Sequence, residues 1–144
     1  MNKVSLCSLP LSRLEELLHR MKTLRAVLIG DMCLDVYWFA DMTKSRLSRE
    51  TPHHPLPVVS EQMSAGAGGN AVVNLATLCD RVTPVGVIGN DWRGRCLGEV
   101  FAKQGVSTDF LVRSDSVITS AYCKPMRRGY AGVDVEDPRI DFEL

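Results

Sequence analysis

Ala65-Gly66-Ala67-Gly68-Gly69-Asn70-Ala71 places three glycines beside one asparagine and leads directly into an amphipathic pattern. Glycine has no Cβ and tolerates positive φ, so a polar ligand can approach the backbone of this segment closely. The first N–H groups of a following helix have no partner inside that helix and point at whatever lies beyond its start. The segment therefore predicts a binding site for a small polyhydroxylated or anionic ligand.

Regular elements extend from this segment in both directions. Apolar residues at helical spacing predict a helix from Gly69 to Cys79, and continuous apolar runs before and after it predict buried parallel strands at 25–30 and 82–88. Asp91 is a good N-cap for a further helix, and 106–112 is a third strand candidate. This order of elements predicts an α/β fold with a doubly wound parallel sheet.

The first 24 residues are predicted to form a helical extension. Ser12 and Glu15 fit a capping box, and apolar residues follow at helical spacing up to about Thr23. We expect this helix to pack outside the main sheet. Serine and proline interrupt the apolar residues before it, which argues against a signal peptide. No apolar run approaches the ~20 residues that a membrane span needs.

A small β-layer is predicted beside the main sheet. The segment 37–57 has the composition of extended or looped chain outside that sheet, with prolines crowding its end. Near the carboxyl end, 117–125 and 140–144 have the pattern of short strands, with a basic turn at 126–130 between them. His53 and His54 fit a surface loop better than a metal site, because adjacent rings flanked by prolines rarely converge on one ion.

Composition narrows the functional classes. The chain has 144 residues, 45% of them hydrophobic, and a formal net charge of zero, which fits one globular α/β unit and argues against nucleic acid as a partner. The cysteines show no zinc-like spacing and are predicted to be reduced thiols of a cytoplasmic protein. These cysteines are Cys7, Cys33, Cys79, Cys96 and Cys123.

The glycine segment also satisfies a dinucleotide-binding pattern. Gly66, Gly68 and Ala71 match G-x-G-x-x-A, which normally closes the first buried strand and opens a helix. Here the preceding residues 60–64 are largely polar, and the buried strand at 25–30 carries no such motif. Binding of a nicotinamide or flavin cofactor is therefore disfavoured.

Four stretches, taken in order, resemble the amino-terminal half of the ribokinase-like (PfkB) sugar kinases, and among these the kinases of heptose 7-phosphate. The resemblance covers residues 25–144, and the first signature of that family is matched by Gly66, Gly68, Asn70 and Gly89. Val72 and Cys79 depart from the residues usual in that signature, and Ser120 stands where related heptose kinases often have lysine. The four stretches are Gly30–Asp35, Ala65–Asn70, Val85–Gly94 and Arg139–Glu143.

The resemblance implies roles for particular residues. Asp35 and Asn70 would hydrogen-bond sugar hydroxyls, Asp31 would help to shape the same pocket, and Gly66 and Gly68 would line it. Ala65–Gly66 would be the hinge of a β-sheet lid made from about 34–61 and 117–144. Closure of the lid would exclude water from the phosphoryl acceptor, and the lid would also join two copies in a homodimer.

Lys124, Arg127 and Arg128 form the only dense basic cluster of the chain. Arginine offers bidentate donors to phosphate oxygens, so Arg127 and Arg128, with Lys124, could clamp a phosphate that the substrate already carries. The alternative is a solvated turn of the lid. Both interpretations stay open on the sequence.

The resemblance also implies what this chain lacks. Members of the family carry a second glycine-rich signature that ends in the catalytic aspartate, and nothing after Asn90 offers that arrangement. We expect a truncated chain that has no catalytic residue or metal site and binds neither ATP nor Mg²⁺ alone, although the complete family member uses both. Its function would be the sugar-binding and lid part of an ATP-dependent kinase of a sugar or sugar phosphate. The alternative is a noncatalytic fragment that binds sugar phosphates or dimerises.

Overall fold

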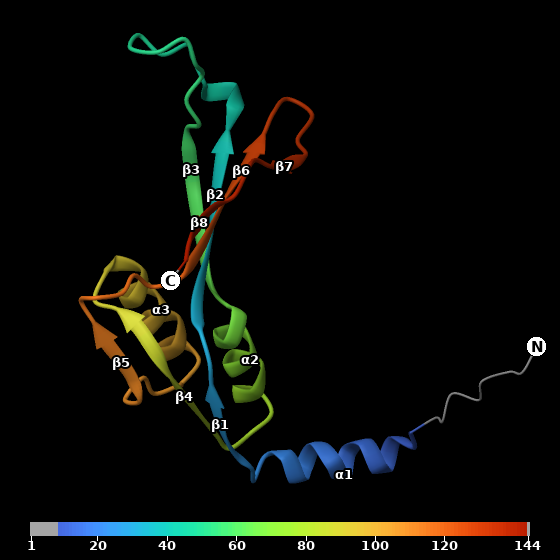
Figure 1. Ribbon diagram of the computed structural model, residues 1–144. Coiled ribbons are helices and arrows are strands. Elements are labelled where there is room, and N and C mark those ends of the chain that lie inside the picture. The colour runs from blue at the N-terminus through green and yellow to red at the C-terminus, as the bar shows by residue number, and fades with distance from the viewer. Residues whose placement is uncertain (1–8, 144) are drawn as a thin grey trace, which may run out of the picture.

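The computed structural model describes residues 9–143, and within them the chain forms two β-sheets that meet end to end (Figure 1). The first is a parallel sheet of three strands in the order β1-β4-β5. The second, which we call the lid sheet, has five strands in the order β3-β2-β6-β7, with β8 paired to β6. The strands are β1 (Arg25–Ile29), β2 (Met32–Asp41), β3 (Val58–Gly66), β4 (Arg81–Gly89), β5 (Leu111–Ser114), β6 (Ala121–Arg128), β7 (Asp134–Glu136) and β8 (Ile140–Phe142).

Two helices pack against the parallel sheet and the adjoining end of the lid sheet and form the core with them. α2 (Ala67–Ala76) contacts β1, β4 and the base of the lid sheet, while α3 (Trp92–Lys103) contacts β2, β3 and β4. The α/β fold with a parallel sheet and a small β-sheet lid is thereby confirmed. The largest buried apolar side chains of this core are Phe101, Met32, Leu34, Ile88, Leu97, Val36 and Val72.

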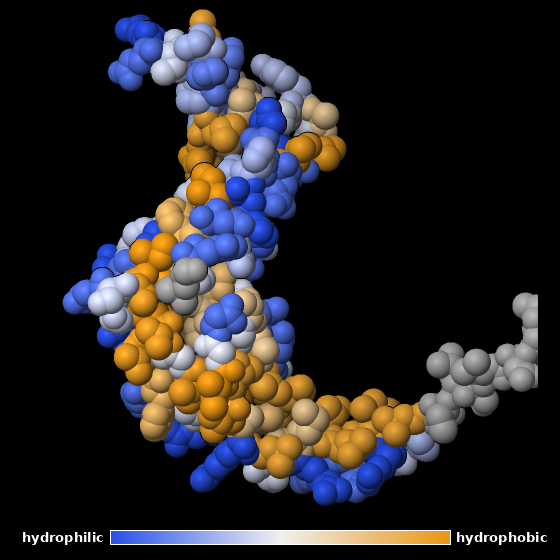
Figure 2. Space-filling model, viewed as in Figure 1, coloured by the Kyte–Doolittle hydropathy of each residue, from blue (hydrophilic) through white to orange (hydrophobic). Residues whose placement is uncertain are grey.

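The face of the parallel sheet that points away from α2 and α3 is not covered by any element among the described residues. On β1, Val27 is 66% and Ile29 is 79% exposed. α1 (Leu11–Met21) projects away from both sheets and buries none of its residues (Figure 1). Apolar surface therefore runs from the parallel sheet along α1 (Figure 2). Among residues 9–143 no helix is long and apolar enough to cross a membrane.

The helical extension starts differently from the prediction. α1 begins at Leu11, and its N-cap is Pro10, whose carbonyl accepts hydrogen bonds from the N–H groups of Arg13 and Leu14. The predicted capping box is therefore wrong, because Ser12 lies inside the first turn and no side chain caps the helix. Residues 1–8, including Cys7, and Leu144 lie outside the described residues.

Three strand boundaries also differ from the prediction. β2 continues to Asp41, so much of the start of 37–57 is regular strand, because both of its edges are paired, with β3 and with β6. β5 begins only at Leu111 rather than at 106. The predicted basic turn at 126–130 is wrong in its first half, since Met126, Arg127 and Arg128 pair with β7 as the end of β6.

The chain passes from one sheet to the other at Gly30–Asp31, between β1 and β2. Two glycines pack against this passage. A Cβ on Gly86 would lie 2.5 Å from the carbonyl oxygen of Gly30, and a Cβ on Gly68 would lie 2.6 Å from that of Asp31. Any side chain at these positions would push α2 or β4 away from the passage, so glycine is required by close backbone contact.

Candidate functional site

One face of the lid sheet is polar where it meets α2. Along β2, Leu34 and Val36 are buried in the core, while Asp35 and Tyr37 are only partly buried. Side chains that alternate along a strand lie on opposite faces, and residues paired across strands share a face. Register pairs Asp35 with Ser64 and Tyr122, and Tyr37 with Gln62 and Lys124. We call these residues the polar lid face: Asp35, Tyr37, Gln62, Ser64, Tyr122 and Lys124.

Lys124 and Asp35 form an ion pair on this face. The Nζ of Lys124 lies 3.2 Å from Oδ1 of Asp35 and donates a hydrogen bond of 3.0 Å to the hydroxyl of Tyr37. Burial by itself would lower the pKa of Lys124, but the hydrogen bond to Tyr37 and the charge of Asp35 outweigh burial and raise it. The ammonium is therefore charged at neutral pH.

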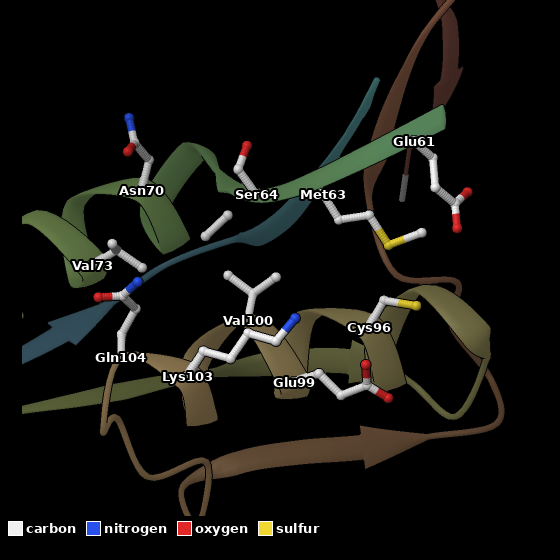
Figure 3. A pocket seen from close by; sticks show the side chains of 11 residues that line it. Glu61, Met63, Ser64, Asn70, Val73, Cys96, Glu99, Val100, Lys103 and Gln104 are labelled. Atoms are coloured by element: carbon white, nitrogen blue, oxygen red, sulfur yellow. The ribbon is translucent and has the colours of Figure 1, made fainter. Parts of the chain in front are cut away.

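Asn70 lies in the first turns of α2, close to the end of β3. Asn70 and Ser64 point to the same side, away from α3 (Figure 3). Because Ser64 is the cross-strand neighbour of Asp35, the carboxylate of Asp35 and the amide of Asn70 project to one side of the chain. Gly66 lies between them, and a Cβ there would be 3.1 Å from Cγ of Asp35. A side chain at this position would therefore press on the carboxylate and shift it by a few tenths of an ångström.

A hollow of about 500 Å³ lies on the other side of β3, between that strand, α2 and α3 (Figure 3). Met63 and Val100 give it an apolar wall, whereas Asn70 lies at its margin. Sequence reasoning missed this hollow, because its walls come from three elements whose distances in space no local pattern reveals. Its polar lining residues include Glu61, Glu99, Lys103 and Gln104.

Asp31 and Cys33 lie close to the same junction. Asp31 is exposed, and its carbonyl oxygen accepts a hydrogen bond of 3.0 Å from the N–H of Gly68, which ties the passage between the sheets to α2. Cys33 is fully buried, and burial, helped by the charges of Asp35 and Asp31, raises the pKa of its thiol to about 11. The thiol therefore stays protonated and is a poor nucleophile.

Arg127 and Arg128 lie away from this junction. Arg128 pairs with Asp41 of β2. Asp41 is six residues beyond Asp35 on that strand, so Arg128 lies about 20 Å from the position of Asp35. Each arginine is already paired, Arg127 with Asp137 and Arg128 with Asp134. A phosphate clamp by these arginines stays a prediction, and their carboxylate partners favour the alternative of a solvated lid segment.

The structure also locates the histidines and the dinucleotide-like motif that the sequence singled out. His53 and His54 are exposed in the connection between β2 and β3, as expected for a surface loop. Among residues 9–143 no three histidine, cysteine or acidic side chains gather to hold a metal ion. Gly66 ends an antiparallel lid strand rather than the first parallel strand, so the context of a dinucleotide-binding turn is missing.

A strained residue directly follows the expected hinge Ala65–Gly66. Ala67, the first residue of α2, has φ +47°, the only positive φ of a non-glycine residue in the described part of the chain. A side chain in this region costs about 1 kcal/mol relative to glycine. We therefore expect Ala67→Gly to raise the free energy of unfolding by about 1 kcal/mol in urea denaturation.

The control for this variant is Ala71→Gly, an exposed position inside the same helix. Glycine there is expected to lower the free energy of unfolding by about 1 kcal/mol, because α-helical backbone favours alanine. Equal losses in the two variants would contradict the assignment of strain to Ala67.

Comparison with known proteins relates the chain to kinases of heptose 7-phosphate. It is 38% identical over 96 residues to the bifunctional protein HldE of Pelobacter propionicus, a match that covers 67% of this chain and 19% of that protein. It is 30% identical over 124 residues to the D-beta-D-heptose 7-phosphate kinase of Bordetella bronchiseptica, covering 86% of this chain and 37% of that one. The chain thus spans about a fifth to two fifths of these curated relatives. No family model matches it.

Solved structures share its fold. The Arabidopsis thaliana ribokinase complexed with ribose and ATP superposes with a TM-score of 0.57 at 21% identity, over 85% of this chain and 36% of that one. The fructokinase of Xylella fastidiosa with bound ATP superposes with a TM-score of 0.53 at 23% identity, over 83% and 30%. At this identity the likeness shows a ribokinase-like fold.

Proposed function

Because the chain belongs to the ribokinase-like (PfkB) carbohydrate kinases, we propose that it supplies the sugar-binding and lid part of an enzyme that phosphorylates a heptose 7-phosphate-like sugar. The observation that carries this proposal is the placement of Asp35 and Asn70 on one side of the chain, where the lid sheet meets α2. A carboxylate accepts hydrogen bonds and an amide both donates and accepts them, so together they suit adjacent sugar hydroxyls.

The neighbouring backbone has a supporting role in this proposal. Gly66 leaves room beside the carboxylate of Asp35, whereas Gly68 lets the start of α2 pack against the carbonyl of Asp31 and so acts on the site indirectly. Asp31 would shape the edge of the pocket. The lid sheet would turn about Ala65–Gly66, where β3 gives way to α2. Closure would exclude water from the acceptor hydroxyl and so limit hydrolysis of ATP.

In the complete enzyme of this proposal, ATP and Mg²⁺ supply the phosphoryl group and neutralise its charge. The described residues position the substrate: they would bind the sugar, orient its hydroxyls and cover it. In this proposal, the base that deprotonates the acceptor hydroxyl lies outside these residues, and so does the nucleotide site. We also propose that two copies associate through the lid, where Tyr130 is 92% exposed beside Val133 and Val135.

The sugar site is tested by binding to the 144-residue chain. Asp35→Asn is expected to weaken binding of D-manno-heptose 7-phosphate at least about tenfold in isothermal titration, because hydrogen bonds to a charged group are lost. The control is Asp109→Asn, an exposed carboxylate in the connection before β5. Equal affinities of Asp35→Asn and the unsubstituted chain would contradict the proposed role of Asp35.

Kinase activity is tested in a chimera. Residues 25–143 joined to the remaining part of the Bordetella bronchiseptica kinase are expected to release ADP in the presence of the heptose phosphate. A chimera that folds and binds the sugar but releases no ADP would favour the noncatalytic alternative.

A further inference from the structure

Lys124 is the cation of the polar lid face, and the two side chains that it contacts are distant from it in sequence. Lys124 lies on β6, and its side chain is only 16% exposed, yet its ammonium reaches Asp35 on β2 at 3.2 Å. The hydroxyl of Tyr37 accepts its hydrogen bond at 3.0 Å, and the ring of Tyr37 lies 4.6 Å away. Asp35 and Tyr37 therefore fix the ammonium on the side of the sheet where the sugar site is proposed.

Three arginines of the lid are, unlike Lys124, paired with carboxylates that have no proposed role in sugar binding. Arg139 makes two hydrogen bonds to Asp141, of 2.6 and 2.7 Å, and stacks on Tyr122. Arg127 and Arg128 are paired with aspartates farther along the lid. Lys124 is different, because its carboxylate partner is the residue proposed to bind sugar hydroxyls. An ammonium has three donors, and protein groups account for two of them here.

We propose that Lys124 binds an anionic group carried by the sugar and thereby makes the site selective for charged sugars. This inference rests on the proposed function. In the free protein Asp35 neutralises Lys124. When an anionic sugar binds, its phosphate or carboxylate takes over that neutralisation, and the oxygens of Asp35 become available to the hydroxyls. A neutral sugar offers no replacement partner, so the same exchange would leave a partly buried cation less well paired.

The test compares three ligands with the 144-residue chain by isothermal titration: D-manno-heptose 7-phosphate, gluconate and D-manno-heptose. Lys124→Met removes the charge and keeps the length of the side chain. It is expected to weaken binding of the anionic sugars about tenfold or more and binding of the neutral sugar less than about threefold. Comparison of the two anionic ligands shows whether phosphate or carboxylate is preferred.

Two further variants separate charge from folding. Lys124→Arg keeps the charge and is expected to retain the preference for anionic sugars. Lys44→Met is the matched control, because Lys44 also pairs with an aspartate at the end of β2, namely Asp41, but lies at the far end of the lid. It should leave all three affinities unchanged, and thermal melting verifies that each variant is folded.

The outcomes distinguish this inference from the proposed function. Equal losses for charged and neutral sugars in Lys124→Met, or no loss, would overturn the role of Lys124 while the sugar site stands. If the unsubstituted chain binds none of the three ligands, both the sugar site and the inference fail. Loss confined to the anionic sugars supports both.

Discussion

Gly68→Ala is expected to lower the free energy of unfolding by about 2 to 3 kcal/mol, because the added methyl group overpacks a contact between two backbones. The new Cβ would lie 2.6 Å from the carbonyl oxygen of Asp31 and 3.3 Å from Cδ2 of Leu28. The N–H of Gly68 donates to that same carbonyl at 3.0 Å, so α2 cannot move away without losing this hydrogen bond. Urea denaturation of the two proteins measures the difference.

Gly30→Ala is the matched control for this variant. Gly30 belongs to the same passage between the sheets, but a Cβ there would meet no atom within 4 Å. Alanine at Gly30 is expected to be neutral or to stabilise the fold slightly, because it restricts the unfolded chain. Similar destabilisation by both variants would show that the passage tolerates no side chain at all. It would contradict the assignment of the loss to the contact between Gly68 and Asp31.

The same contact matters for the proposed site. Asn70 is two residues beyond Gly68 on α2, whereas Asp35 is carried by β2. The contact between Gly68 and Asp31 therefore fixes the helix that carries the amide against the strand that carries the carboxylate. A shift of α2 would change the spacing of the two side chains, so Gly68→Ala should weaken sugar binding even at temperatures where the variant remains folded.

Much of this arrangement could be predicted from local patterns. The strand at 82–88 and the N-cap at Asp91 depend on neighbours in sequence, and the structure confirms both. In these places a local rule and the tertiary environment favour the same structure. The glycine-rich segment is expected to admit a ligand, but at Gly68 the space of the missing side chain is taken up by the backbone of Asp31 instead.

The differences arise where distant chain segments determine the outcome. The basic neighbours of Met126 predict a turn, but pairing with β7 keeps this residue in the strand. The ion pair between Lys124 and Asp35 joins residues almost ninety positions apart, and only the parallel register of β2 and β6 brings them together. A pattern within one strand indicates which face a side chain occupies, but it carries no information about the strand alongside.

A second glycine-rich turn contains the most heavily bonded carboxylate of the described residues. Oδ1 of Asp91 accepts a hydrogen bond of 2.9 Å from the N–H of Gly94 and caps α3. Oδ2 accepts bonds from the N–H of Thr119 at 3.0 Å and from Arg93 at 2.6 Å. The guanidinium of Arg93 in turn lies 4.4 Å from the ring centre of Phe142 on β8. Asp91 thus joins α3 to the base of the lid sheet.

We expect Asp91→Ala to lower the free energy of unfolding by about 3 kcal/mol or more, because it leaves a buried guanidinium without its partner. Arg93 is only 8% exposed, and the variant would also remove the N-cap of α3. Asp115→Ala is the control, since Asp115 is exposed and accepts one side-chain hydrogen bond, from Asn90 in the same region. A loss below about 1 kcal/mol in Asp91→Ala would show that solvent replaces the network readily.

The pH dependence of Asp91→Asn tests the charge itself. Burial alone would raise the pKa of Asp91, but hydrogen bonds from Gly94, Thr119 and Arg93 outweigh burial and lower it to about 2, from 3.8 in an unstructured chain. A lowered pKa means that ionisation stabilises the folded state, by about 2 kcal/mol, at any pH well above 3.8, and that this stabilisation disappears as the pH falls through about 2. Asparagine keeps the shape but cannot ionise. The difference in stability between the two proteins should therefore be constant from pH 7 to about 5 and shrink toward pH 2. A difference that does not change with pH would mean that the geometry of the cap, rather than its charge, holds α3 to the lid.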